Sequence, residues 1–191
     1  IVIIVLVLIG YNWAVGFQNQ AVTDQETAET AWSNVESSYQ RRNDLIGNLV
    51  QTVQGAADFE RGTLTDVIEA RSRATSTTID ANNLDPAQLA AYQEAQTGLS
   101  SALSRLLVTV ERYPELKANQ NFLELQTQLE STENRINVAR DRYNEAVNTY
   151  NILIRKFPNS LLAGLFNFDE MPRYQADPGA EQAPEVEFDF Q

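Results

Sequence analysis

The residues with the most evident chemistry form a polar run in the first third of the chain. Arg41 and Arg42 come first, and Asp44 and Asn48 follow, one helical turn apart. Two oxygen-bearing side chains at that spacing can contact a cation, but two ligands without a ligand-rich loop do not make a calcium or magnesium site. We therefore expect no bound metal, and we treat the run as a structural or interaction motif.

Arg42 differs from its neighbours because it falls on a helix face that is otherwise apolar. An unpaired guanidinium on such a face is strongly destabilising, so it needs a carboxylate partner, and Glu133 or Glu36 can supply one. We interpret Arg42 as structural polarity that fixes the register of the helices, while a binding role stays open. Arg140, close to Glu133 in the sequence, belongs to a mixed-charge stretch that is typical of a solvated helix face.

The absence of two residue types excludes most catalytic chemistry. The sequence contains no histidine and no cysteine, which rules out Ser-His and cysteine nucleophile systems, His/Cys zinc sites and disulfides. No pair of carboxylates stands out as acid and base, although a hydrolase of that kind stays open. The net charge of −12 repels phosphate backbones and argues against nucleic acid as a partner. We expect a non-enzymatic protein without a cofactor.

The first seventeen residues, Ile1 to Phe17, contain no charged side chain. As a helix they would extend about 25 Å, slightly less than the hydrocarbon layer of about 30 Å, so a few residues before Ile1 would complete a span. We predict a transmembrane anchor over residues 1–17, with Tyr11, Trp13 and Phe17 at the membrane–water interface. A signal peptide and a buried soluble helix are the alternatives.

Beyond Asp24 the apolar residues recur at alternating steps of three and four, the period of packed helices. No proline lies between the anchor and residue 54, so anchor and first helix are expected to form one rod about 80 Å long. A short helix is predicted over residues 58–77, and Asp85 with Pro86 opens another that Pro114 ends or kinks. The last long helix carries eleven seam positions, from Phe122 to Phe157. These segments predict an all-α fold, an antiparallel bundle of about four helices over residues 18–168.

Two segments follow the last long helix. Residues 157–168 are apolar but too short to span a membrane, so we expect them to fold back on the bundle, with the bilayer surface as the alternative. Residues 169–191 hold seven acidic residues and one basic residue, Arg173. Because such a composition buries too little apolar surface to fold, we predict a flexible acidic tail.

At these positions the chain resembles the LemA family. The matching segments cover nearly the whole chain: Tyr11-Asn12, Trp32, residues 41–50, Glu69-Ala70-Arg71, residues 113–122, Leu125-Gln126, Leu129, residues 132–136, Ala139-Arg140, Tyr143-Asn144, Val147, Tyr150-Asn151, Phe157-Pro158, Pro184 and Val186. The resemblance implies one N-terminal transmembrane helix, a long antiparallel bundle and a bacterial envelope protein without an assigned catalytic site. Gly47 stands where the family usually has proline, so a kink or irregular turn is expected there.

We therefore expect a membrane-anchored bacterial envelope scaffold or adaptor whose partners are membrane lipid and further copies of itself. Rods held parallel by a membrane are already partly aligned, which lowers the entropy lost on lateral contact. The alternative is an accessory binding module that contacts a membrane protease or another envelope protein through its acidic tail. The expected location is the bacterial inner membrane as a single-pass protein. The nearest basic residue after the span is Arg41, so the charges leave both orientations open, and a short basic flank before Ile1 would place the bundle outside the cytoplasm.

Overall fold

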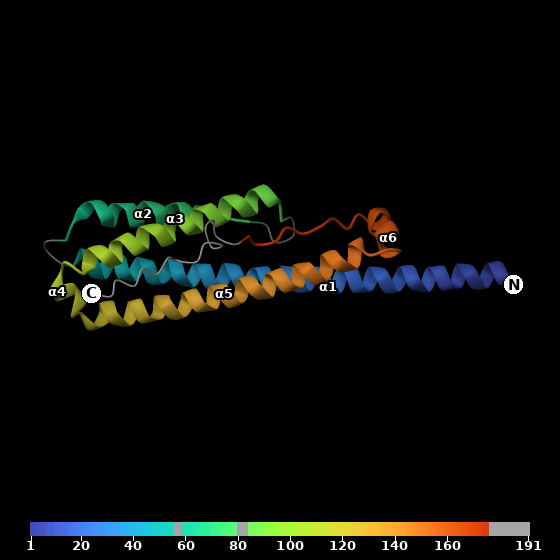
Figure 1. The fold of residues 1–191 in the computed structure, drawn as a ribbon, viewed down its shortest axis with the longest axis horizontal. Helices are drawn as coiled ribbons and strands as arrows, with labels where there is room; N and C mark the ends of the chain where they lie inside the picture. Colours follow the sequence, from blue (N-terminus) through green and yellow to red (C-terminus); the bar gives the residue numbers. More distant parts are fainter. Residues whose placement is uncertain (56–58, 80–83, 176–191) are drawn as a thin grey trace, which may run out of the picture.

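The computed structural model describes residues 1–55, 59–79 and 84–175, and these form six helices and no strand. They are α1 (Val2–Gln54), α2 (Arg61–Ser76), α3 (Pro86–Val110), α4 (Pro114–Lys117), α5 (Gln120–Arg155) and α6 (Asn159–Phe166). The predicted all-α fold is confirmed. In Figure 1, α1 and α5 lie antiparallel along the long axis, and the α2–α3 hairpin packs beside the half of α1 that is remote from the N-terminus.

The first helix continues without interruption from the apolar start into the bundle, as the missing prolines predict. With 53 residues and a rise of 1.5 Å per residue, α1 is about 80 Å long. It also passes through Gly47 as α-helix, so the irregular turn expected there is absent from α1. Gly47 instead makes room for a neighbour, because a Cβ at this position would lie 3.0 Å from Nη2 of Arg71. The Arg71 Nε donates to the carbonyl of Asn43 at 2.8 Å and links α2 to α1.

The helix boundaries follow from capping residues. The Asp85 carboxylate accepts a hydrogen bond from the Ala87 amide at 2.8 Å, and Pro86 occupies the first turn of α3, as predicted. The Asn119 side chain caps α5 by accepting from the amides of Asn121 and Phe122. α3 ends at Val110, and Pro114 opens the short α4. The helix predicted over 58–77 is shorter, Arg61–Ser76, and residue 58 lies outside the described residues.

Three apolar clusters follow one another along the rod. The first fills the space between α1, α2, α3 and α5 at the end remote from the N-terminus, and it includes Ile46, Leu49, Leu99 and Leu106. The second is aromatic, because Trp32 lies against the rings of Tyr92 and Tyr143 at centroid distances of 5.5 and 5.2 Å. The third joins α1, α5 and α6 through Phe17, Ala21, Tyr150, Ile154 and Ala163.

The eleven-position seam of α5 is correct only in its first part. Beyond Tyr143 the predicted seam residue Tyr150 is buried, but the buried positions on either side of it are one residue further along the sequence than predicted, at Val147 and Ile154. A straight α-helix turns 3.6 residues per turn, so its buried face drifts about 20° per heptad relative to a strict repeat. Phe157, the last predicted seam residue, lies beyond the end of α5 and is 78% exposed.

The prediction that a flexible tail begins at residue 169 is wrong for its first part. After α6 ends at Asn167, which adopts the left-handed conformation that asparagine tolerates, residues 167–175 run back along α5. We call this segment the strap (Figure 1). Its backbone is held by side chains of α5, and Tyr174 is buried. The rest of the predicted tail, residues 176–191, lies outside the described residues.

Candidate functional site

A buried polar layer crosses the bundle at Arg42, which is 3% exposed. Its Nη1 donates to Oε2 of Glu133 at 3.1 Å and to the Ser100 hydroxyl at 2.9 Å. Its Nη2 donates to Oε1 and to the carbonyl oxygen of Gln96, at 2.7 and 3.2 Å. The Gln96 amide in turn donates to the carbonyl of Ala74 at 3.4 Å. One guanidinium thus connects α1, α3 and α5, and Gln96 extends the layer to α2.

Of the two carboxylates considered for Arg42, the structure pairs it with Glu133, whose side chain is 47% exposed. Glu36 is half-buried elsewhere on α1, and burial raises its pKa above the usual range. Because the ends of the Arg42 guanidinium are fully occupied by protein groups, this residue positions helices and does not face a ligand.

Asp44 and Asn48 are exposed and lie on another face of α1 from Arg42. They border a shallow hollow between α1 and α2 that also contains Gly47 and Arg71. Across the described residues, no group of three or more acidic side chains is placed to hold a metal ion. The hollow therefore combines the oxygen-bearing side chains of Asp44 and Asn48 with the guanidinium of Arg71. A positive group beside two oxygens does not favour a bound cation, and the side chains of Asp44 and Asn48 are exposed to water.

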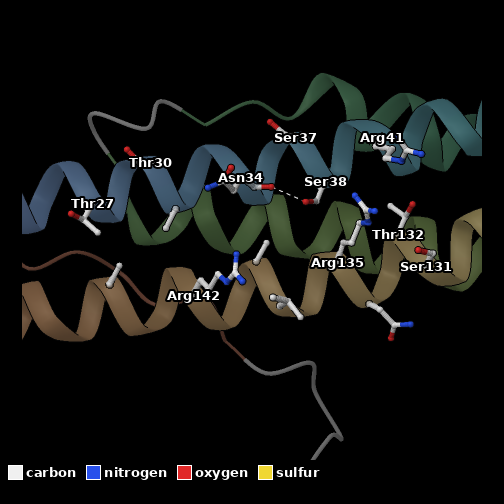
Figure 2. Close-up of a pocket in the computed structure, with 15 residues that line it drawn as sticks. Thr27, Thr30, Asn34, Ser37, Ser38, Arg41, Ser131, Thr132, Arg135 and Arg142 are labelled. Atoms are coloured by element: carbon white, nitrogen blue, oxygen red, sulfur yellow. Dashed lines mark hydrogen bonds between the residues drawn. The ribbon is translucent and has the colours of Figure 1, made fainter.

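An open groove of about 850 Å³ lies between α1 and α5. Figure 2 shows its floor of small side chains and the side chains of Arg135 and Arg142 reaching from α5 toward α1. Arg41 lines the same groove from α1. The remaining described residues that line it are small or uncharged: Thr27, Thr30, Ala31, Asn34, Ser37, Ser38, Ser131, Thr132, Asn134, Val138, Ala139 and Ala146.

The described residues that line the groove carry a net positive charge. Arg41, Arg135 and Arg142 are exposed, and no carboxylate among residues 1–55, 59–79 and 84–175 lies within 4.0 Å of them. None of its described lining residues is acidic, so the groove presents donors and few strong acceptors. Guanidinium groups spaced along a shallow groove bind carboxylates or other oxyanions.

Another face of α5, away from the groove, holds the strap through three asparagines spaced about one helical turn apart. The Asn144 side chain accepts from the amide of Tyr174 at 2.8 Å and donates to its carbonyl at 3.0 Å. Asn151 makes the same two bonds with Met171, at 3.0 and 2.9 Å. Asn148 accepts from Nη2 of Arg173 at 2.6 Å. Each paired asparagine imitates the edge of a β-strand, which explains why the strap is extended.

The Tyr174 ring closes the strap onto the aromatic cluster. Its hydroxyl lies 2.6 Å from that of Tyr39, and the Arg140 guanidinium lies 4.0 Å above the ring centroid. Nη2 of Arg140 also donates to the carbonyl of Gln175 at 3.3 Å. Burial raises the pKa of both tyrosines above the ordinary value, so their hydroxyls stay protonated at neutral pH.

The predicted motif residues therefore separate into distinct places. Arg42 and Glu133 form the buried layer, Arg41 lines the groove, Asp44 and Asn48 border the α1–α2 hollow, and Arg140 holds the strap. The charges around Arg135 and Arg142 have the sequence pattern of a solvated helix face, and this pattern does not reveal the groove that they line. The strap-binding asparagines were not predicted either, although Asn144, Asn148 and Asn151 recur at helical spacing.

The three predicted interface aromatics also separate. Tyr11 and Trp13 are exposed on the part of α1 that extends beyond the bundle. Phe17 is 4% exposed, and its ring packs on those of Phe166 and Phe168 at centroid distances of 6.5 and 5.9 Å. Phe17 thus belongs to the core. α1 is the described helix long and apolar enough to cross a membrane, with a mean hydropathy of 1.6 over its most apolar stretch.

Comparison with known proteins gives a consistent set of relatives. The family model described as the LemA family matches residues 31–188. Magnetosome protein MamQ 1 of Paramagnetospirillum magneticum is 29% identical, and MamQ of Magnetospirillum gryphiswaldense is 27% identical. Each alignment covers 85% of this chain and 66% of the relative, so the chain spans slightly less than two thirds of either MamQ protein. Protein LemA of Metamycoplasma hominis is 25% identical, over 85% of this chain and 70% of its own length.

Proposed function

The chain belongs to the LemA family, and on that premise we propose that it is a membrane-anchored, non-enzymatic scaffold that associates side by side with copies of itself. In this proposal α1 crosses the membrane through its uncharged N-terminal segment and projects the bundle from the bilayer. We place it on the envelope or on an organelle membrane of a bacterium, with the bundle outside the cytoplasm. Its similarity to magnetosome proteins and the apolar start of α1 support a membrane location.

The observation that carries the proposal is the arginine-lined groove between α1 and α5. It runs along the rod, it is open to the side, and it leaves three guanidinium groups without a carboxylate from the described residues. A lateral neighbour that brings acidic groups would complete it. The absence of a titratable general base from its described lining favours binding over catalysis.

The occupant we propose for the groove is the acidic segment 176–191 of a neighbouring copy. This segment contains five acidic residues and no basic residue: Asp177, Glu181, Glu185, Glu187 and Asp189. Its charge is complementary to that of Arg41, Arg135 and Arg142. Ion pairs between these carboxylates and the exposed guanidinium groups would be screened by salt, so we expect the contact to weaken as the salt concentration rises.

A neighbour's segment fits the geometry better than the chain's own. Each helical residue advances about 100° around the axis, so Arg135 and Arg142 lie on the opposite face of α5 from Asn144. The strap leads the chain toward residue 176 along the asparagine face. A second rod placed beside the groove would present its own residues 176–191 there without passing around α5.

The absence of cysteine from the sequence allows a direct test by site-specific crosslinking. One tagged copy carries Ser38→Cys in the groove, and a differently tagged copy carries Ala183→Cys in the acidic segment. Both are reconstituted together in liposomes and treated with a short bifunctional thiol reagent. We expect a product that carries both tags, and we expect its yield to fall with Arg135→Glu and Arg142→Glu or with added salt.

Val108→Cys serves as the matched control, because it is 72% exposed on α3 and away from the groove. It should give no more two-tag product than chance collisions do. A crosslink that forms only when both cysteines are in one chain would assign the groove to the chain's own tail. A strict monomer by mass measurement in lipid nanodiscs would contradict self-association.

A further inference from the structure

The segment Phe157–Phe168, which we call the foot, presents two different apolar faces. It contains no charged residue. One face, with Ala163 as its buried residue and Leu162 and Phe166 partly buried, packs into the third cluster. The other face is exposed through Phe157, Leu161 and Leu165, which are 78%, 66% and 71% accessible and follow one another at four-residue steps. Such a continuous apolar stripe calls for a partner that removes it from water.

The position of the foot along α1 indicates which partner this is. The rings of Phe166 and Phe168 pack on Phe17, which is the last residue of the predicted anchor over residues 1–17 and the first buried residue of α1. On the N-terminal side of this contact, α1 extends away from the bundle with the exposed apolar side chains of residues 1–9. The short helix α6 therefore lies beside α1 at the level where the proposed membrane span ends (Figure 1).

The flanks of the foot suit the boundary between acyl chains and headgroups. Arg155 and Lys156 precede it, both exposed, and Asp169 and Glu170 follow it. Arg155 is paired with Glu170 at 3.3 Å, which compensates one charge of each sign at the edge. A short helix with an uncharged apolar face and basic residues at its margin lies in the plane of a bilayer, where lysine reaches the phosphate oxygens.

From this geometry we infer that the foot inserts Phe157, Leu161 and Leu165 into the interfacial layer of the same bilayer that α1 crosses. The inference rests on the membrane anchoring of the proposed function and adds a second lipid contact to it. A bilayer is favoured over a second copy because the foot packs on α1 at Phe17, at the bundle end of the proposed anchor, whereas the open groove of a neighbour is polar and basic. Two contacts at one end of the rod restrain its tilt, which aligns neighbouring grooves.

The experiment measures the depth of fluorophores attached to single cysteines in the full chain. Leu161→Cys and Leu165→Cys carry an environment-sensitive dye, Leu6→Cys is the anchor reference, and Val108→Cys is an exposed apolar control on α3. Each variant is reconstituted in vesicles of phosphatidylcholine and phosphatidylglycerol that contain a nitroxide either near the headgroup or near the end of the acyl chain. Circular dichroism verifies that each labelled variant keeps its helical content.

We expect the headgroup-proximal nitroxide to quench the dyes at positions 161 and 165 several-fold more than the dye at 108, and more than the deep nitroxide does. The dye at position 6 should be quenched most by the deep nitroxide. If position 6 is quenched while 161 and 165 behave like 108, the inference about the foot is wrong and membrane anchoring stands. If position 6 is unquenched, anchoring itself fails, and the foot inference fails with it. Emission at 161 that responds to dilution with unlabelled protein, without lipid quenching, would assign the stripe to a contact between copies.

Discussion

At the scale of single residues, Arg42 illustrates how one buried charge specifies the packing of several helices. A slide of α1 by one turn would remove its Nη atoms from Gln96, Ser100 and Glu133 together. The partners are unequal, however. Gln96 is buried and depends on the guanidinium for its side-chain oxygen, whereas Glu133 is half in water. The two ends of the ion pair should therefore respond differently to substitution.

We expect Arg42→Met to lower the free energy of unfolding by about 2–4 kcal/mol, because buried acceptors of Gln96 lose their donor. Glu133→Gln should cost about 1 kcal/mol, since Arg42 keeps its bonds to Gln96 and Ser100. Urea unfolding of the detergent-solubilised full chain, followed by circular dichroism, measures both. Equal losses for the two variants would show that the carboxylate, not the buried acceptors, dominates the layer.

The buried tyrosines give the bundle a defined response to alkali. Burial, with a smaller effect of the Asp169 and Glu29 charges, raises the pKa of Tyr150 to about 12. Below pH 10 the hydroxyl is protonated in the folded and in the unfolded chain, so this residue contributes no pH dependence. Between about pH 10 and 12 the unfolded chain releases the proton and the folded chain retains it, so stability falls by up to about 1.4 kcal/mol per pH unit.

We therefore expect the unfolding midpoint to be flat from pH 8 to 9.5 and to fall above pH 10, more steeply than one tyrosine explains, since burial also raises the pKa of Tyr92 and Tyr143. In Tyr150→Phe the unfolding midpoint should fall less steeply with pH, because one of the tyrosines that titrate only in the unfolded chain is missing. Thermal unfolding in a pH series tests this. An unchanged alkaline slope in the variant would show that Tyr150 titrates normally in the folded chain.

At the scale of elements, the strap is held to α5 largely by bonds from side chains to its backbone. Its extended backbone is bonded at Met171 and Tyr174 by Asn151 and Asn144. Trypsin needs an extended, unpaired backbone around Arg173, and the paired amide and carbonyl of Tyr174 withhold it. The asparagines should therefore control cleavage between Arg173 and Tyr174.

The double variant Asn144→Ala/Asn151→Ala is expected to speed tryptic cleavage after Arg173 by about thirtyfold, because each of the two lost pairs of bonds contributes on the order of 1 kcal/mol to closing the strap. Mass spectrometry of the released fragment 174–191 follows the rate. Asn134→Ala, an exposed asparagine on the groove side of α5, is the matched control and should leave the rate unchanged. Equal rates in all three proteins would mean that the Tyr174 ring and the remaining bonds from Tyr143, Asn148 and Arg140 hold the strap without the two asparagines.

The strap also shows where prediction from the sequence stopped. Seams of apolar residues fixed the long helices, and Asp85 with Pro86 located the start of α3, because both signals are local. The acidic composition of residues 169–191 predicted disorder, since composition does not register that Asn144 and Asn151 lie twenty or more residues earlier on a helix that can bind backbone. The groove was missed for a related reason: Arg135 and Arg142 look like any solvated charges until the opposite helix is placed.

At the scale of the whole molecule, the rod divides into an uncovered end and a packed bundle at Phe17. Residues 1–13 are all exposed, and Ala14 alone of residues 1–16 is half-covered, so these residues make little contact with the bundle. Phe17 and Ala21 are buried against α5 and α6. The boundary between the proposed anchor and the fold therefore falls at residue 17, and the predicted anchor over residues 1–17 includes one residue of the core.

Two truncations separate anchoring from folding. Deletion of residues 1–16 should leave the unfolding midpoint within a few degrees of the full chain, because it removes almost no buried surface. The same deletion should shift the protein from the lipid to the aqueous fraction in vesicle flotation, since three apolar side chains of the foot hold a bilayer far more weakly than a spanning helix does. Deletion of residues 1–21 removes Phe17 and Ala21 as well, and it should cost about 3–5 kcal/mol and loosen α6 from α5. A large loss of stability on deletion of residues 1–16 would mean that the uncovered end of α1 contributes to the fold. If the protein without residues 1–16 still floats with the vesicles, the foot, and not α1, makes the principal membrane contact.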